Sequence, residues 1–372
     1  MIIFLSSLVL PFLFTHCSDK PSLGKSNSIR DNSSTTTEVF THPGIINSAA
    51  TLNRVENISI ETEAYLGLLS FIEENPIADS YPAQVIVVAS GATPTEDHIR
   101  RDAILAYAYA LKWVKTGAAE DARGAISILN GWATNFEVYL AERGTPTAQI
   151  QLEAAWVAPS FAAAAEIIRR YRRTTGAGAG WTANEIQAFS DFLVKLEDYI
   201  DPMITDIRQN GRRINNWGAS AGYAKMALGV FLESEDSYKA GKDLILDLLP
   251  QIIKEDGEVL ELCSRDCHHP QYSMSALTYA AEIAQVQGDV SIYQANNNRL
   301  GVGWEWMYAA FSGNMTCRNC SNSRIFPAVE IAANYYPSFD IRTLNESQRP
   351  HVLAGQGNTF LGFTTLSHFG DQ

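Results

Sequence analysis

Residues 99–117, IRRDAILAYAYALKWVKTG, set a pattern that recurs through most of the chain. Apolar residues return at steps of three and four, which is the period of a helix with a buried face, and the stretch stops at Gly117. Residues 121–144 (DARGAISILNGWATNFEVYLAERG) repeat the pattern and stop at Gly144. Both stretches therefore predict a helix that ends at a glycine-marked turn.

More helices are predicted further along the chain. Residues 151–180 continue the pattern, and Pro159 should kink or begin a helix there. Residues 182–204 open with Thr182 and Glu185, which have the spacing of a capping box. Later helices are expected near 218–233, 237–254, 271–287, 299–312 and 325–336. Only residues 84–90 (QVIVVAS) are typical of a strand, or of a buried connector.

About ten helices with short turns and no sustained heptads indicate an all-α fold of antiparallel helical hairpins. Stacked hairpins of this length form either a solenoid or a closed α/α toroid. The chain shows no clear repeat of roughly 34 or 40 residues, which a helical solenoid would display. The sequence therefore favours the toroid.

The composition is that of a globular protein with an acidic balance. The 372 residues are 46% hydrophobic and 19% charged, with a formal net charge of −13. Non-specific nucleic-acid binding requires a basic face, so this class of function is disfavoured. An anionic substrate stays compatible with the sequence, because a cleft can be locally basic on an acidic protein.

The N-terminal residues indicate secretion. Residues 1–17 carry an apolar stretch too short for a membrane span, and we interpret them as a signal peptide; an uncleaved buried strand is the alternative. The polar residues 18–41 predict a flexible linker, and residues 42–372 predict a single domain with the toroid fold. Sequons for N-glycosylation favour a secreted eukaryotic protein, and they begin at Asn32, Asn57, Asn314, Asn319 and Asn345.

Without the signal peptide, four cysteines remain in two close pairs: Cys263, Cys267, Cys317 and Cys320. With the neighbouring histidines they could in principle hold zinc. An oxidising compartment makes disulfides the preferred interpretation. Spacing does not determine the pairing, but a bridge between the two pairs would fasten two distant loops together.

Residues 265–272, RDCHHPQY, form the first candidate site. Pro270 suits the first position of a helix, so Arg265, His269 and Tyr272 should lie together at a helix start. The helix dipole favours negative charge there, which predicts that the Tyr272 phenol ionises more easily than usual. The alternative is a loop held by cysteines, with a tyrosine that only makes a structural hydrogen bond.

The second candidate site lies within residues 209–226, QNGRRINNWGASAGYAKM. Arg213 adds positive charge just before Asn215, Asn216 and Trp217. An indole can stack on a sugar face while amide and guanidinium groups bind hydroxyls and carboxylates. The alternative is an asparagine-capped helix start with a core tryptophan, and Trp156 could likewise lie in the core.

The chain contains no G-x-S-x-G elbow, P-loop, Rossmann glycine pattern or H-E-x-x-H motif, and its acidic residues single out no glycosidase pair. Asparagine, arginine, histidine and tyrosine together suit β-elimination from a uronic acid. The amide and guanidinium groups neutralise the C5 carboxylate, and histidine or tyrosine moves the proton.

At these residues the chain resembles the alginate lyase superfamily of polysaccharide lyases. The similarity runs from about residue 42 and includes ALKWVKTG, AISILNGWA, LEAAWVAPSFAAAAEII, INNWGAS, RDCHHPQYSMSALTYAAEIA and NRLGVGWEWM. Arg265 and Tyr272 are seven residues apart, as are the family's catalytic arginine and tyrosine, and Asn216 lies about 50 residues earlier. The resemblance implies an incomplete (α/α) toroid that binds an anionic polysaccharide. We expect no cofactor or metal, because Asn216 and Arg265 would do the neutralising.

The resemblance also implies roles for individual residues. Asn216 would neutralise the carboxylate, Arg265 would stabilise charge, His269 would be the base or its helper, and Tyr272 the acid or acid/base. One departure is that Trp217 follows Asn216, where the mannuronate-specific branch has histidine; branches with Asn-Trp carry a histidine at the position of His269. The expected substrate-binding residues are Trp156, Arg213, Asn215, Trp217 and His268, the last also being the alternative to His269.

Two other functions compete with a secreted polyuronate lyase. One is a glycoside hydrolase on a related α/α scaffold, which would work with two carboxylates. The other is a non-catalytic carbohydrate-binding or cell-wall protein that kept the fold. Alginate, glucuronan and related polyuronides remain open as substrates.

Overall fold

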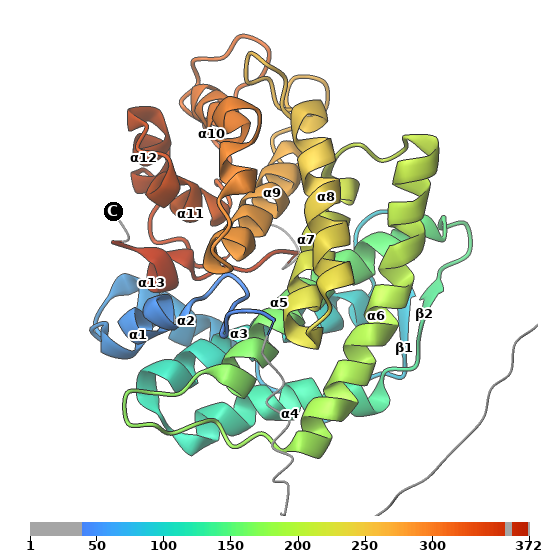
Figure 1. Ribbon diagram of the computed structural model, residues 1–372, viewed down its shortest axis with the longest axis vertical. Helices are drawn as coiled ribbons and strands as arrows, with labels where there is room; N and C mark the ends of the chain where they lie inside the picture. The colour runs from blue at the N-terminus through green and yellow to red at the C-terminus, as the bar shows by residue number, and fades with distance from the viewer. Residues whose placement is uncertain (1–38, 354–358, 371–372) are drawn as a thin grey trace, which may run out of the picture. The chain divides into compact units, whose positions relative to one another are not determined.

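The computed structural model describes residues 39–353 and 359–370; the predicted signal peptide, most of the predicted linker and Asn32 lie outside this part. Helices make up most of the described chain (Figure 1). In order, they are α1 (Ala49–Asn57), α2 (Glu63–Glu74), α3 (Pro94–Thr116), α4 (Ala119–Asn135), α5 (Ala148–Arg170), α6 (Ala183–Asn210), α7 (Asn216–Leu232), α8 (Glu235–Ile252), α9 (His269–Val286), α10 (Ser291–Phe311), α11 (Ala328–Tyr335), α12 (Phe339–Glu346) and α13 (Thr364–His368).

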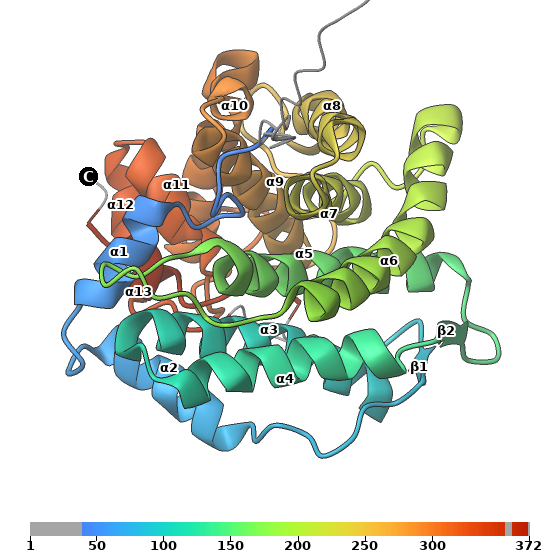
Figure 2. The same ribbon diagram turned by 60° about the horizontal axis from the view of Figure 1, so that its bottom comes forward.

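The helices alternate between an inner and an outer row. Along the inner row, α3, α5, α7, α9 and α11 each pack against the next, and α4, α6, α8 and α10 cover them from outside. Helix α13 contacts both α11 and α1, and α1 packs on α3, so the row returns to its start (Figures 1 and 2). Hairpins in a ring are the arrangement expected of a toroid rather than a solenoid.

Burial distinguishes the two rows. Helix α7 is buried from Gly218 to Phe231, all around its circumference, as an inner helix must be. The outer helix α6 instead buries a single stripe that includes Phe189, Phe192 and Leu196. Small residues let α7 and α8 approach closely, since a Cβ atom on Gly241 would lie 2.5 Å from the carbonyl oxygen of Gly222.

Several sequence predictions of local structure are confirmed. Helix α3 ends at Gly117, which adopts the left-handed conformation with a φ of 68°. Thr182 and Glu185 form the predicted capping box of α6. Pro159, which was expected to kink or begin a helix, lies inside α5 and does not begin one. The helix predicted for 299–312 is the second part of α10, beyond non-helical residues 295–298.

The prediction of one helix through residues 121–144 was wrong. Helix α4 ends at Asn135, and β2 (Val138–Ala141) then pairs in parallel with β1 (Gln84–Val87), the strand that the sequence did predict. The apolar period continues through both segments because Phe136 and Tyr139 are buried beside each other. Periodicity alone therefore could not show the change from helix to strand.

The first described residues lie across the ends of three inner helices. The imidazole of His42 contacts the carboxylates of Glu166 on α5 and Glu233 at the end of α7. The backbone N–H of Gly44 also donates to Glu166, at 3.1 Å. The Thr41 N–H donates to Gln287 at the end of α9, at 2.8 Å. These contacts fasten residues 41–44 to the ring.

Within the residues that the structure describes, no helix is both long and apolar enough to cross a lipid bilayer.

The attachment of residues 41–44 to the ring should depend on pH. Burial by itself lowers the pKa of His42, but its hydrogen bond to Glu166 and the nearby carboxylates raise the pKa above the ordinary 6.5. The stabilisation is therefore complete below pH 6.5 and is lost as the pH rises through the higher folded-state value. We expect His42→Gln to lower the free energy of unfolding by about 1–2 kcal/mol at pH 6 and by clearly less at pH 9, measured by urea titration.

Gln287→Ala is the matched control, because it removes contacts to the same segment without removing a titrating group. Its effect should be the same at both pH values. An equal loss at pH 6 and pH 9 for His42→Gln would contradict the expectation.

Candidate active site

A pocket of about 120 Å³ opens at the N-terminal ends of three inner helices. Each of α5, α7 and α9 contributes residues from its first turns, and the segment after β1 adds Ala89. The lining residues are Ala89, Gln149, Leu152, Trp156, Asn216, Trp217, Arg265, His269 and Tyr272. Helix N-termini present free N–H groups and a positive dipole end, so the pocket suits an anionic ligand.

The pocket unites the two candidate sites of the sequence. All four predicted catalytic residues line it, together with Trp156 and Trp217. Among its described lining residues there is no aspartate or glutamate, so the pair of carboxylates required by the hydrolase alternative is missing there. The larger surface hollow beside Phe40 and Tyr238 has no histidine, asparagine or arginine among its described lining residues.

The start of α7 presents Asn216 to the pocket. Asn215 is the N-cap, and its side chain accepts from the Trp217 N–H at 3.1 Å. Asn216 is only 1% exposed, and its Nδ2 donates to Oε2 of Glu261 at 3.3 Å. Of the predicted sugar-binding residues, Asn215 therefore acts as a cap and lies outside the lining.

Arg213 also lies outside the lining, behind Trp217. Its guanidinium carbon is 5.4 Å from the centre of the indole ring, and it forms an ion pair with Asp206. The arginine thus packs against the tryptophan that lines the pocket.

The start of α9 is held by Asp266, whose importance the sequence did not reveal. Its Oδ1 accepts from the backbone N–H groups of His268 and His269, each at 2.8 Å, and its Oδ2 lies 2.6 Å from Nδ1 of His269. Burial raises the pKa of Asp266, but these hydrogen bonds outweigh burial and keep it below the ordinary value. A charged Asp266 holds the proton on Nδ1 and leaves Nε2 of His269 as the basic atom.

Tyr272 stands one turn into α9, with its ring 5.6 Å from that of His269 and perpendicular to it. Trp156 and Phe360 lie 5.9 Å and 6.1 Å from the phenol ring. Burial raises the pKa of Tyr272 above 10 even though Arg100 and Arg265 oppose the shift. The prediction of an easily ionised phenol was wrong, because desolvation outweighs the effect of the two arginines.

Arg265 reaches the pocket from the loop before α9. Its Nη1 donates to Oε1 of Glu261 at 2.6 Å, so one carboxylate contacts both Arg265 and Asn216. Arg318 supports the same loop by donating to the carbonyl oxygens of Cys263 and Arg265, at 3.2 Å and 3.1 Å.

The predicted disulfides are confirmed, and both join the two cysteine pairs. Cys263 bonds to Cys317, and Cys267 bonds to Cys320. Sulfurs in these bonds are not thiolate ligands, so the zinc alternative does not apply to them. In the described part of the chain, no cluster of three or more His, Cys, Asp or Glu side chains could hold a metal. Cys267 lies between Arg265 and His269, so its bridge holds the loop that carries both.

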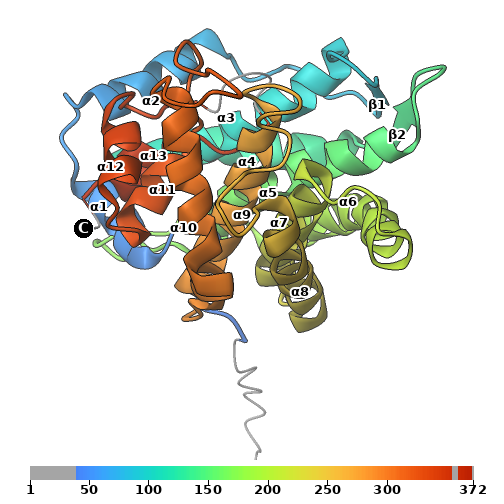
Figure 3. The ribbon, with the colours of Figure 1, turned by 90° about the horizontal axis from the view of Figure 1, so that it is seen from above.

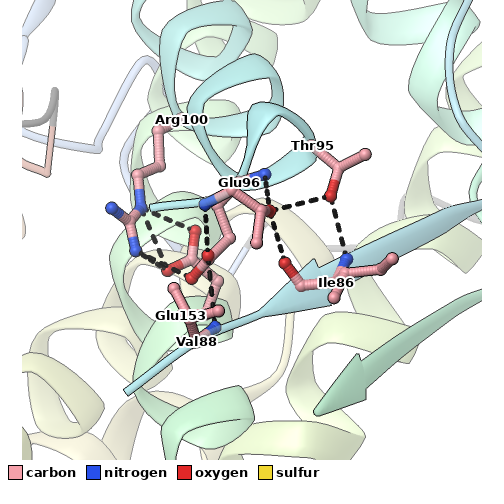
Figure 4. Close-up of polar contacts among 7 residues, drawn as sticks. Ile86, Val88, Thr95, Glu96, Arg100 and Glu153 are labelled. Carbon is pink, nitrogen blue, oxygen red and sulfur yellow. Dashed lines mark hydrogen bonds and ion pairs between the residues drawn. The ribbon is translucent and has the colours of Figure 1, made fainter. Parts of the chain in front are cut away.

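The part of the pocket that is lined by Trp156 and Ala89 is supported by a buried ion-pair network (Figure 4). Arg100 on α3 binds both carboxylate oxygens of Glu153 on α5 and also contacts Glu96. Its guanidinium carbon lies 5.2 Å from the ring centre of Trp156. Glu96 accepts from the Val88 N–H at 3.2 Å, next to Ala89 in the lining. The network thus fixes the position of Trp156 relative to the segment at the end of β1.

Solved structures of alginate lyases share this fold. Alginate lyase A1-III from Sphingomonas species A1 superposes with a TM-score of 0.65 at 15% identity, over 88% of this chain and 97% of its own. A Tyr-to-Phe variant of alginate lyase A1-III, complexed with a tetrasaccharide, gives 0.66 at 14% identity, over 90% and 98%. An alginate lyase from Bacteroides ovatus gives 0.63 at 11% identity, over 89% and 99%. The ring is therefore an incomplete α/α toroid.

Sequence comparison identifies the family. The alginate lyase family profile matches residues 89–316, which is more than half of the chain and includes every residue that lines the pocket. The chain belongs to the alginate lyase family and is a polysaccharide lyase. No curated protein sequence matches it.

The Cys267–Cys320 bridge should support both stability and turnover. It closes a sequence separation of 53 residues, for which the chain-entropy model gives about 4 kcal/mol. We expect the double variant Cys267→Ser, Cys320→Ser to lose stability on that scale, measured by chemical denaturation. Its lyase turnover should also fall below that of the matched variant Cys263→Ser, Cys317→Ser, because only Cys267 lies between Arg265 and His269. Equal turnover in the two variants would contradict this expectation.

Proposed function

We propose that the protein is a secreted enzyme that cleaves a polyuronate, most simply alginate, by β-elimination to leave unsaturated uronate ends. The observation that carries the proposal is the pairing of His269, held by Asp266, with Tyr272 in one pocket that also contains Asn216 and Arg265. Family membership supports lyase chemistry. The tetrasaccharide complex of alginate lyase A1-III supports a chain-like uronate ligand.

In the proposed mechanism, Asn216 and Arg265 bind the carboxylate on C5 of the sugar. The amide donates one N–H and the guanidinium supplies positive charge, so less negative charge remains on the carboxylate. This makes the C5–H bond more acidic. The three helix N-termini around the pocket favour the same negative charge. Trp156 and Trp217 offer ring faces to the neighbouring sugar rings.

His269 then accepts the C5 proton on Nε2. The electron pair of the C5–H bond forms the C4=C5 double bond, the bond from C4 to the glycosidic oxygen breaks, and Tyr272 protonates the leaving oxygen. A raised pKa keeps the Tyr272 phenol protonated at neutral pH, which suits an acid rather than a base. Asp266 stabilises the imidazolium that forms on His269.

The test is to incubate the protein separately with polymannuronate, polyguluronate and glucuronan and to follow the ultraviolet absorbance of the unsaturated ends. We expect a rise with at least one polymer, which identifies the substrate. Reducing ends that appear without any absorbance rise would contradict β-elimination.

Tyr272→Phe removes the proposed acid while keeping the ring. We expect turnover to fall by about 100-fold or more, with the affinity for oligouronates largely retained. The matched control is Tyr223→Phe, which removes the hydroxyl of a buried tyrosine that does not line the pocket. It should leave turnover near that of the wild type. Unchanged turnover in Tyr272→Phe would remove this residue from the mechanism.

We further propose a signal peptide at residues 1–17, a linker at 18–41 and a catalytic domain at 42–372. Secretion is supported by the two disulfides and the sequons. The asparagines of the described sequons differ in their exposure. Asn57, Asn314 and Asn319 are exposed, whereas Asn345 is fully buried, with its Nδ2 3.1 Å from Glu330 and its Oδ1 2.8 Å from His351.

Protein secreted from a eukaryotic host should therefore carry N-glycans at the exposed Asn57, Asn314 and Asn319 and none at Asn345. Peptide mass spectrometry before and after enzymatic deglycosylation measures the occupancy of each site. Asn57→Gln and Asn314→Gln should each remove one glycan without affecting turnover. A glycan on Asn345, or bare Asn57 and Asn314, would contradict the proposal.

A further inference from the structure

We propose that Glu261 is a positioning residue of the active site, which holds Asn216 and Arg265 in the geometry that binds the substrate carboxylate. The inference rests on the proposed function. Glu261 lies outside the pocket lining, but its two carboxylate oxygens contact the two lining residues separately: Oε2 accepts from Asn216 and Oε1 from Arg265.

The backbone of Glu261 provides an independent indication. Its φ is +70°, in the left-handed region that glycine and asparagine occupy most readily. Its carbonyl oxygen accepts from the N–H groups of Arg265 and Asp266, at 2.9 Å and 3.3 Å, which closes the loop before α9. A glutamate at a position that suits glycine indicates that the side chain is needed for something other than the turn.

The chemistry of the carboxylate explains what the side chain does. A carboxylate only accepts hydrogen bonds, so it fixes the Asn216 amide with its NH₂ group toward Glu261 and leaves the second N–H for the substrate. The Arg265 side chain is 47% exposed, whereas that of Glu261 is 14% exposed. The better-buried partner therefore confines a long side chain that would otherwise sample many rotamers.

Positioning predicts a particular kinetic effect. Without Glu261, the two groups still bind the carboxylate, but they are no longer held where charge develops in the transition state. Loss of the negative charge beside the site also removes a repulsion toward a polyanion. Turnover should therefore fall while KM does not rise.

The most informative variant is Glu261→Gly, because glycine adopts the observed φ without strain. We expect its melting temperature to stay at or above that of the wild type, its kcat to fall by about 10- to 100-fold, and its KM to stay level or decrease. Glu261→Gln keeps an acceptor for Asn216 but loses the charge that binds Arg265. Its kcat should therefore lie between those of the wild type and Glu261→Gly. Glu258→Ala removes a carboxylate of the same loop that pairs with Lys254, and it should match the wild type.

A readout without turnover separates this proposal from the proposed function. Protein labelled with ¹⁵N-asparagine reports the side-chain amide of Asn216, assigned by its loss in Asn216→Ala. That signal should shift in Glu261→Gly and stay in place in Glu258→Ala. An unmoved signal, or a wild-type kcat in Glu261→Gly, would overturn the positioning role. A wild type inactive on all three polyuronates would instead overturn the proposed function, while the amide signal still decides the role of Glu261.

Discussion

The shared direction of the inner helices is the constraint on which the site depends. The helices α5, α7 and α9 pack side by side (Figure 3), and each is separated in the chain from the next by an outer helix that returns it, so their N-terminal ends meet at one pocket. Their first turns supply most of the pocket lining. The partial positive charges of three helix ends therefore meet in one place. An acidic protein can in this way hold an anionic sugar without a large basic surface.

Side chains outside the pocket fix the orientation of those within it. Asp266 holds His269, Glu261 contacts Asn216 and Arg265, and the network of Arg100, Glu96 and Glu153 lies behind Trp156. Each of these supporting side chains is a carboxylate or is paired with one, whereas the described residues that line the pocket include no carboxylate side chain. Negative charge is thus kept beside the site and out of the place where the uronate carboxylate would bind. The two disulfides add a covalent hold on the loop from Cys263 to Cys267.

The sequence predicted the helical ring well and named six of the nine residues that line the pocket, whereas Arg213, Asn215 and His268 lie outside the lining. Apolar periodicity located the inner helices, and the position of Pro270 placed His269 and Tyr272 at a helix start. The supporting residues could not be found in this way, since Glu261 and Asp266 are ordinary acidic residues among 41 until the fold brings them to their partners. The strand β2 and the raised pKa of Tyr272 were also missed. Both depend on tertiary packing, which local sequence patterns do not reveal.

The central claim is that the pocket breaks the glycosidic link by elimination and not by adding water. The most direct test is mass spectrometry of the oligosaccharides released from the preferred polyuronate, because a fragment with an unsaturated end is one water lighter than the corresponding hydrolysis product. Elimination predicts one unsaturated end for each cut, with no water added to the summed mass of the fragments. Saturated ends with one water added at every cut would contradict the roles assigned to His269 and Tyr272.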